Sequence, residues 1–137
     1  MKTGVFKGRG PVQAAFRDNV ALVRVDAVTT QAGPLKKRIS AALRREIGPM
    51  RPSYAPFEAR IWTSVVAGTA RAAYDVDNVA KACLDALTGV FWHDDRQVAR
   101  LVSERFVGDR ARILIRVRRL DAPLAPVALD GSLFDAD

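Results

Sequence analysis

Two segments of the chain alternate between apolar and other residues with the period of two that a half-buried β-strand requires. Residues 57–66 are apolar at most of their alternate positions, and residues 112–120 place Ile113, Ile115 and Val117 between positions that are mostly arginine. Each of these strands has one face suited to a core and one suited to solvent. The fold is therefore expected to contain a sheet whose apolar face is covered by another layer.

Two other segments have apolar residues three and four positions apart, which is the spacing of one helix face. Residues 34–47 lie between two Gly-Pro pairs, and such pairs are typical signals for the start and stop of a helix. Residues 78–88 are helical by composition, and Gly89 is a natural stop. Both segments are predicted to be helices that pack on the sheet.

Residues 20–29 alternate loosely and contain many β-branched residues, which predicts a strand. Residues 97–107 are predicted to be a further strand. This further strand is joined to residues 112–120 by Gly108-Asp109-Arg110, which suits a hairpin turn. The order β-α-β-α-β-β predicts a single α+β domain with a mixed sheet and two helices.

Composition divides the chain into three zones. Residues 1–18 are rich in Gly, Lys and Arg and are expected to form a flexible basic arm. Residues 19–120 are expected to form the folded domain. Residues 121–137 contain four Asp and no Lys or Arg, and we expect them to form an extended acidic tail.

The chain carries a net charge of +7 at neutral pH, and the residues before the acidic tail are more basic still. Such a surface usually binds a polyanion, either nucleic acid or an anionic membrane. No apolar run approaches the ~20 residues needed to cross a bilayer, and the N-terminus lacks the apolar core of a secretory signal. We therefore expect a cytoplasmic protein with no membrane partner, whose partner is a nucleic acid.

The chain has a single cysteine, Cys83, and a single histidine, His93. One cysteine excludes an intramolecular disulfide and a cysteine zinc site, and one histidine excludes a multi-histidine metal site. Cys83 is expected to be a small core residue, in keeping with a reducing compartment. Any metal site must consequently be built mainly from carboxylates.

Two aspartates, Asp75 and Asp77, precede the second predicted helix. If the backbone there is extended, residues two apart point to the same side, and their charges repel unless a cation lies between them. Mg²⁺ is the expected cation because it prefers oxygen ligands. Taken alone, the pair could instead be a solvated turn or a helix cap.

Lys81 and Asp85 follow Asp77 at steps of four residues and share one helix face with it. Lys81 could hold a scissile phosphate oxygen or stabilise developing negative charge. The simpler interpretation is a pair of surface ions one helix turn apart. Asp94 and Asp95 lie beyond this helix, so only the fold could bring them close to the first pair.

The segment from Asp75 to Gln97 reads D-V-D-N-V-A-K, then D-A-L, and then D-D-R-Q after a link that contains aromatic residues. Taken together, these elements resemble the signature of the RusA family of Holliday-junction resolvases, which shows D-x-D-N-x-x-K, D-A-L and D-D-x-Q at matching spacing. The resemblance covers most of residues 19–120. Two segments depart from the family pattern: residues 16–19 lack prolines, and residues 67–74 contain only one arginine.

The resemblance implies a homodimer that binds a four-way DNA junction, requires Mg²⁺ or Mn²⁺, and cuts opposing strands symmetrically. Bacterial or phage origin is also implied by it. The implied acidic metal-binding site is Asp75, Asp77 and Asp95, with Lys81 as a further catalytic residue and Asp85 and Asp94 in supporting roles. The expected phosphate contacts are the arginines Arg38, Arg44, Arg45, Arg71, Arg112, Arg116 and Arg118.

Three other functions remain open at this point. A non-catalytic protein that binds junctions or other branched DNA explains the charge but not the clustered acidic residues. A nuclease that prefers flaps or replication forks would keep the same chemistry on another substrate. An RNA-binding protein is disfavoured because the strands lack an aromatic RNA-binding pattern.

Overall fold

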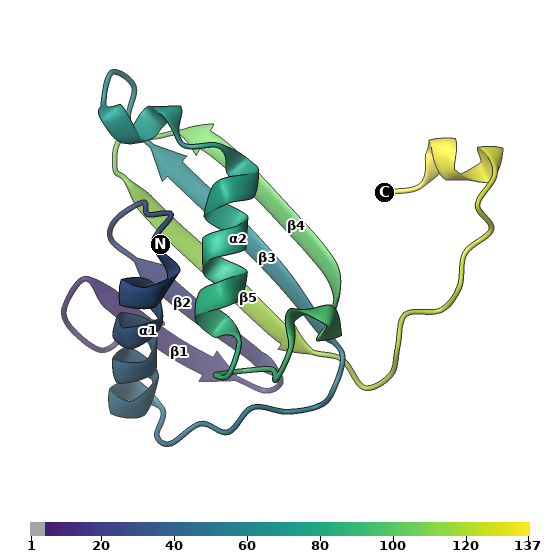
Figure 1. Ribbon diagram of the computed structural model, residues 1–137, viewed down its shortest axis with the longest axis horizontal. Helices are drawn as coiled ribbons and strands as arrows, with labels where there is room; N and C mark the ends of the chain where they lie inside the picture. Colours follow the sequence, from purple (N-terminus) through teal and green to yellow (C-terminus); the bar gives the residue numbers. More distant parts are fainter. Residues whose placement is uncertain (1–4) are drawn as a thin grey trace.

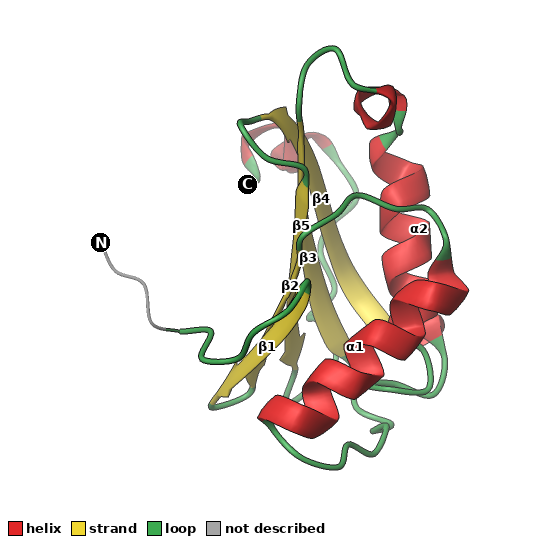
Figure 2. Ribbon diagram, turned by 90° about the vertical axis from the view of Figure 1, so that its left-hand side faces the viewer, coloured by secondary structure: helices red, strands yellow, loops and turns green. Residues whose placement is uncertain are grey.

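The computed structural model describes residues 5–137, apart from the side chain of Arg71. A five-stranded sheet is covered on one face by two helices, while the opposite face is open (Figures 1 and 2). The strands are β1 (Val12–Arg17), β2 (Val20–Val25), β3 (Phe57–Val65), β4 (Val98–Val107) and β5 (Arg112–Arg119). The helices are α1 (Ala32–Glu46) and α2 (Val76–Leu87), with short 3₁₀ turns η1 (Ala70–Ala73), η2 (Asp95–Gln97) and η3 (Gly131–Asp135). The α+β class, the mixed sheet and the two helices are as predicted.

The order of the strands across the sheet is β1-β2-β5-β3-β4. β5 lies between β2 and β3 and is antiparallel to both, whereas β3 and β4 are parallel. The predicted hairpin between residues 97–107 and 112–120 is therefore wrong. The reason is burial: Ile113, Ile115 and Val117 of β5 are at most 2% exposed, so β5 occupies the centre, while the mostly exposed β4 forms an edge.

The connection from β4 to β5 crosses over the end of β3. The backbone N–H of Gly108 donates to the carbonyl of Val65 at 2.8 Å, and Ser64 Oγ donates to the carbonyl of Arg110 at 2.7 Å. A Cβ atom at Gly108 would lie 2.5 Å from Ser64 Oγ, so a side chain there would clash. The segment Gly108-Asp109-Arg110 thus forms a connection that passes closely over the end of β3, and it is not a hairpin turn.

The sheet begins at β1, seven residues before the predicted domain boundary at residue 19. β1 pairs with β2 over all six of its residues, and Val12 and Ala14 are only 4% exposed. The turn between them places Asp18 at φ 57°, a left-handed conformation that Asp tolerates better than most residues. Alternation in residues 12–17, followed by Asp18-Asn19, is a pattern typical of a β-hairpin. Of the predicted arm, residues 1–4 lie outside the described part of the chain.

Each helix packs an apolar face against the sheet. α1 buries Leu35, Ile39 and Leu43, which are the positions that its sequence pattern predicted. α2 buries a face that includes Cys83, and burial raises the pKa of that thiol to about 12. Trp92 follows α2 and is 0% exposed, with its indole N–H donating to Thr88 Oγ1 at 3.0 Å.

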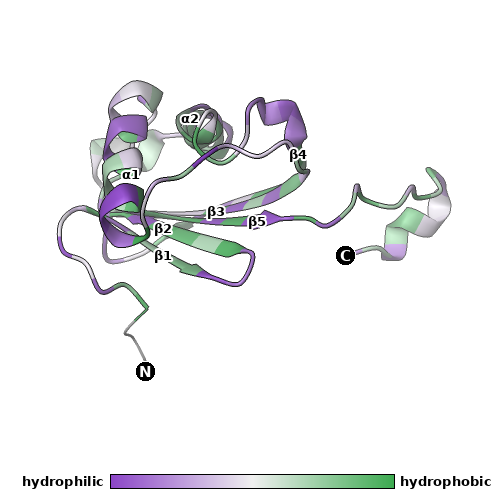
Figure 3. Ribbon diagram, turned by 90° about the horizontal axis from the view of Figure 1, so that it is seen from below, coloured by the Kyte–Doolittle hydropathy of each residue, from purple (hydrophilic) through white to green (hydrophobic). Residues whose placement is uncertain are grey.

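The open face of the sheet carries charged and aromatic side chains, and Figure 3 shows that no helix covers it. Arg60 and Arg116 lie over the ring of Trp62 at 4.7 Å and 5.8 Å from its centroid. Glu58 is 9% exposed because Arg100, Arg116 and Arg118 surround its carboxylate. Ion pairs and cation–π contacts, in place of a layer of helices, therefore cover this face of the sheet.

Residues 121–137 leave the end of β5 and run away from the sheet (Figure 1), and every one of them is exposed. Near the end of this segment, Asp130 accepts hydrogen bonds from the backbone N–H and the hydroxyl of Ser132 at 2.8 Å and 2.6 Å. These bonds hold the pKa of Asp130 below its usual range. Within residues 5–137, neither helix is long and apolar enough to cross a membrane.

The central position of β5 predicts a large loss of stability on truncation of its core side chains. Ile115→Ala should lower the free energy of unfolding by ~2–5 kcal/mol, because Ile115 is 0% exposed and its loss leaves a cavity. Urea denaturation followed by tryptophan fluorescence measures the change. The matched control is Leu129→Ala, at a residue 87% exposed, which should change stability by no more than ~0.5 kcal/mol. Similar effects of the two variants would contradict the central placement of β5.

Candidate active site

The first acidic pair lies at the start of α2. Asp75 is the residue before the helix and has an extended backbone, with φ −77° and ψ 150°, while Asp77 lies in the first turn. Both residues are exposed, and both line a hollow formed by residues 72–77 together with Ser103 and Arg105 of β4. Asp75 and Asp77 therefore lie beside the same hollow.

Two residues of β4 attach that strand to the segment that carries the acidic pair. Ser103 Oγ donates to the carbonyl of Val76 at 3.4 Å, and the guanidinium of Arg105 donates to the carbonyl of Ala72. Arg105 therefore brings a positive charge to the hollow that holds Asp75 and Asp77. Nothing in the sequence pattern indicated Ser103 or Arg105, because they come from an edge strand far along the chain.

The exposed face of α2 continues this polar surface. A second hollow is lined by residues that include Asp75, Asn78, Lys81 and Asp85. Lys81 Nζ lies 3.4 Å from Asp85, and the Lys81 side chain is 76% exposed. The two residues thus form the i,i+4 surface pair that the sequence allowed. Such exposed pairs contribute ~0–1 kcal/mol, so Lys81 is not committed to this contact.

Asp94 caps the short turn η2. Its carboxylate accepts from the backbone N–H of Arg96 at 2.9 Å, and that bond, followed by the Arg96 side chain, holds the pKa of Asp94 below its usual range. The side chain of Gln97 returns to accept from the backbone N–H groups of His93 and Asp94 at 2.8 Å and 3.1 Å. This reciprocal arrangement is a capping box, and it fixes the backbone around Asp95.

The amide nitrogen of Gln97 also holds a second loop. It donates to the carbonyls of Ser53 and Ala55 at 2.7 Å and 2.8 Å. One side chain therefore joins residues 53–55 to residues 93–94 through four hydrogen bonds. The glutamine of the D-D-x-Q element consequently has a positioning role, which its capping-box spacing could have indicated.

Asp95 lies at the other end of α2 from the first pair. It lines a hollow with Lys36, Asp85, Thr88, His93 and Asp94, beside the last turn of the helix. α2 has 12 residues, so its two ends are separated by ~18 Å. Among the described residues, no three His, Cys, Asp or Glu side chains come close enough to hold a metal ion. A single chain thus does not bring Asp95 to Asp75 and Asp77.

The sequence was compared with known proteins and protein families. The sequence model of the family described as Endodeoxyribonuclease RusA matches residues 12–118. The chain belongs to the RusA family. Enzymes of this family are Holliday-junction endodeoxyribonucleases that depend on a divalent metal and bind branched DNA. A search of curated proteins found no match.

The RusA match begins at Val12, which is also the first residue of β1. The family domain therefore includes the hairpin of β1 and β2, in agreement with the structure. Within this domain, the three hollows that contain these carboxylates lie on the helix-covered side of the sheet, along α2. The predicted phosphate contacts on the helix-covered side are therefore on the same side of the sheet as these hollows.

The predicted phosphate contacts of this RusA domain divide between two sides. Three of them project from β5 onto the open face of the sheet, where Arg112 is paired with Asp26 at 2.8 Å and both Arg116 and Arg118 face Glu58. These three lie across the sheet from the carboxylates of α2. The others come from the helix-covered side: Arg38 and Arg44 are exposed on α1, Arg45 donates to the carbonyl of Val12 at 3.0 Å, and Arg71 lies in η1 with a side chain outside the described residues.

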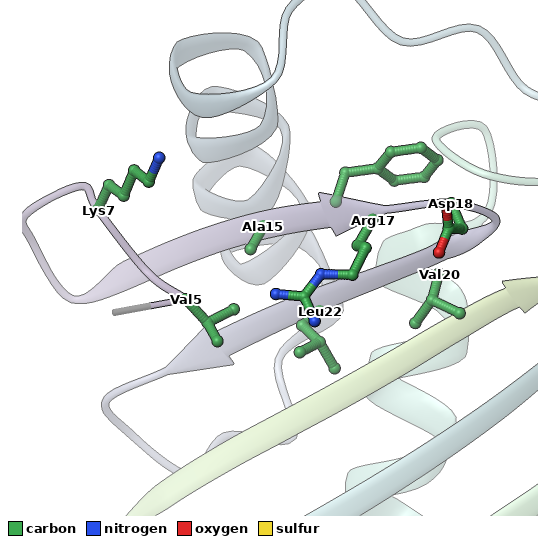
Figure 4. A pocket seen from close by; sticks show the side chains of 8 residues that line it. Val5, Lys7, Ala15, Arg17, Asp18, Val20 and Leu22 are labelled. Carbon is green, nitrogen blue, oxygen red and sulfur yellow. The ribbon is translucent and has the colours of Figure 1, made fainter. Parts of the chain in front are cut away.

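The open side of the sheet also carries a partly apolar hollow. Figure 4 shows it between β1, β2 and the segment before β1, with Val5, Ala15 and Leu22 among its lining residues. Lys7, Arg17 and Asp18 supply its charged groups. It contains one carboxylate and lies away from α2, so it is not part of the acidic site.

The role of Gln97 predicts that its loss loosens the loops around Asp95. Gln97→Ala removes four hydrogen bonds and should lower the free energy of unfolding by ~1–3 kcal/mol. Amide hydrogen exchange should become faster in residues 53–55 and 93–95 but not in β5. Arg96→Ala is the matched control, because the Arg96 side chain is 87% exposed and forms a surface ion pair with Asp94. Unchanged exchange in both loops would contradict the positioning role.

Proposed function

We propose that this RusA-family chain is an Mg²⁺-dependent endonuclease that resolves four-way DNA junctions by paired, symmetric strand cuts. Asp75, Asp77 and Asp95 would bind the metal, with Mn²⁺ as a substitute, and Lys81 would act beside them. The observation that carries this proposal is that exposed acidic groups of the family motif lie beside both ends of α2, within an otherwise basic domain. Acidic groups in a protein that binds a polyanion oppose binding unless a cation neutralises them.

The separation of the acidic groups favours a site completed by a second copy of the chain. In a two-fold dimer, a surface that contacts its own copy makes every contact twice. If the α2 helices of two copies run antiparallel, the Asp75 end of one helix faces the Asp95 end of the other. Two equivalent sites would then form, each with Asp75 and Asp77 from one chain and Asp95 from its partner. We propose this homodimer as the active form.

The chain's own groups would supply charge and position at such a site. Exposed carboxylates have the oxygen ligands that Mg²⁺ prefers, and a bound divalent ion would neutralise phosphate charge and lower the pKa of a water. Lys81 is exposed and held only weakly by Asp85, so its ammonium group is free to contact a phosphate oxygen. Gln97 would keep Asp95 in place through the capping box.

A dimer with two equivalent sites suits the substrate. A four-way junction has approximate two-fold symmetry, and its resolution requires two cuts in strands of like polarity. Two sites related by a dimer axis would make these cuts at symmetric positions. The basic residues of α1 lie on the same side of the sheet as α2 (Figure 2), and we expect their contribution to affinity to fall steeply with salt.

Loss of a carboxylate should separate binding from cleavage. Asp75→Asn should bind a labelled four-way junction with near wild-type affinity but cleave it roughly 10²-fold more slowly or worse, because a charged ligand is lost. Cleavage of the junction by the wild-type protein should require Mg²⁺ and should stop when EDTA is added. Asp109→Asn, at an exposed aspartate in the β4–β5 loop, is the control and should cleave normally. Cleavage rates on junction, flap and fork substrates are compared to test the preference for junctions. Full activity of Asp75→Asn would exclude this acidic site.

A mixing experiment tests whether each site is shared between two chains. Asp75→Asn and Asp95→Asn should each be inactive alone, yet a mixture should recover strand nicking. In a mixed dimer, one site contains both substitutions and the other contains neither, so one intact site remains. The readout is nicking of a labelled junction after exchange of subunits. If each site belonged to one chain, mixing the two variants would restore no nicking activity. Each variant mixed with the wild-type protein gives the reference level of nicking.

A further inference from the structure

An exposed pair of stacked rings lies beside the hollow that contains Asp95. The rings of Tyr54 and His93 have centroids 3.8 Å apart and an interplanar angle of 16°. Tyr54 is 82% exposed, and the exposed large apolar and aromatic residues that exceed it, Leu129 and Phe134, lie in the acidic tail. A large aromatic ring in this position exposes an apolar surface on the folded domain without covering any core.

The position of Tyr54 is fixed from both sides. The carbonyls of its neighbours Ser53 and Ala55 accept from the side chain of Gln97. The backbone N–H of Ser53 also donates to the carbonyl of Phe91 at 2.9 Å, and that of Ala55 donates to Ser53 Oγ at 3.1 Å. Tyr54 thus projects from a loop that is held against the core. A ring fixed in this way loses little conformational entropy when it binds a ligand.

His93 connects this ring to the acidic site. It lines the same hollow as Asp85, Asp94 and Asp95, and its backbone N–H is held by Gln97. The capping box that positions Asp95 therefore also positions the stacked pair. His93 covers one face of the Tyr54 ring, so the ring's opposite face is the one available to a ligand.

The geometry points to Tyr54 as a stacking platform for an unpaired nucleobase next to the phosphate that is cut. This inference rests on the proposed nuclease function and adds a base-binding site to it. A planar nucleobase would extend the stack of His93 and Tyr54 by one ring. Base–aromatic stacking is sequence-tolerant and strong enough to hold an unstacked nucleotide. Opening of a base pair at the branch point of the bound junction would provide one.

The surroundings of the ring favour nucleic acid over an apolar partner. Arg51, three residues before Tyr54, is exposed, as is Arg96 in η2. The neighbouring hollow contains Lys36 and carboxylates rather than apolar side chains. A flat aromatic face beside a polar hollow, with exposed arginines in the adjoining segments, suits a base that is attached to a charged backbone.

Binding to a fluorescent junction tests the platform directly. The junction carries 2-aminopurine at the branch point, and the cleavage-defective Asp75→Asn protein serves as the parent so that the DNA stays intact. The parent should quench 2-aminopurine by stacking. Adding Tyr54→Ala should abolish this quenching and weaken binding by roughly five- to a hundredfold. Tyr54→Phe should retain both properties because the ring remains.

The control is Phe134→Ala in the same parent, which removes an aromatic ring that is 93% exposed but lies in the tail. It should bind and quench like the parent. Equal quenching and affinity for Tyr54→Ala and the parent would overturn the platform, and so would a change from dimer to monomer in sedimentation, which would assign Tyr54 to a protein contact. The nuclease proposal is judged separately, by cleavage of the same junction by the wild-type chain.

Discussion

The position of β5 is the constraint on which the other elements depend. β1 pairs with β2, and β4 pairs with β3, but only β5 joins these two pairs into one sheet. The join is stabilised by burial of alternate β5 side chains beneath the helices. Because β5 comes late in the chain, the sheet closes only after nearly all of the domain is available. Its pairings span long sequence separations, which is the property that slows folding.

The packing of α2 determines how the charged groups are distributed. Its apolar face is buried in the core, so the opposite face, with Asp77, Lys81 and Asp85, must point outward. A helix of this length keeps the carboxylates at its two ends ~18 Å apart, well beyond a Debye length of ~8 Å at physiological salt. Repulsion between the two ends is therefore small in one chain. It would become large only where two chains brought the acidic groups together, and there a cation would relieve it.

Much of this arrangement could be predicted from local sequence patterns. The two helices and four of the strands follow from periodicity, and residue spacing indicates that Asp75 and Asp77 lie close to one another. The position of β5 could not be predicted, because alternation indicates which face of a strand is buried but not which strands are its neighbours. The separation of Asp95 from Asp75 and Asp77 could not be predicted for the same reason. Local patterns also missed Ser103, Arg105 and Tyr54, whose positions depend on contacts between distant segments.

The burial of Cys83 has a practical consequence. Its thiol lies on the buried face of α2, where burial raises its pKa and so favours the protonated form. A protonated, enclosed sulfur is a poor nucleophile towards maleimides and oxidants. We therefore expect the native chain to react with thiol reagents as though it had no cysteine. A cysteine introduced on its surface would be a unique attachment point for a spectroscopic probe, with Cys83 left in place.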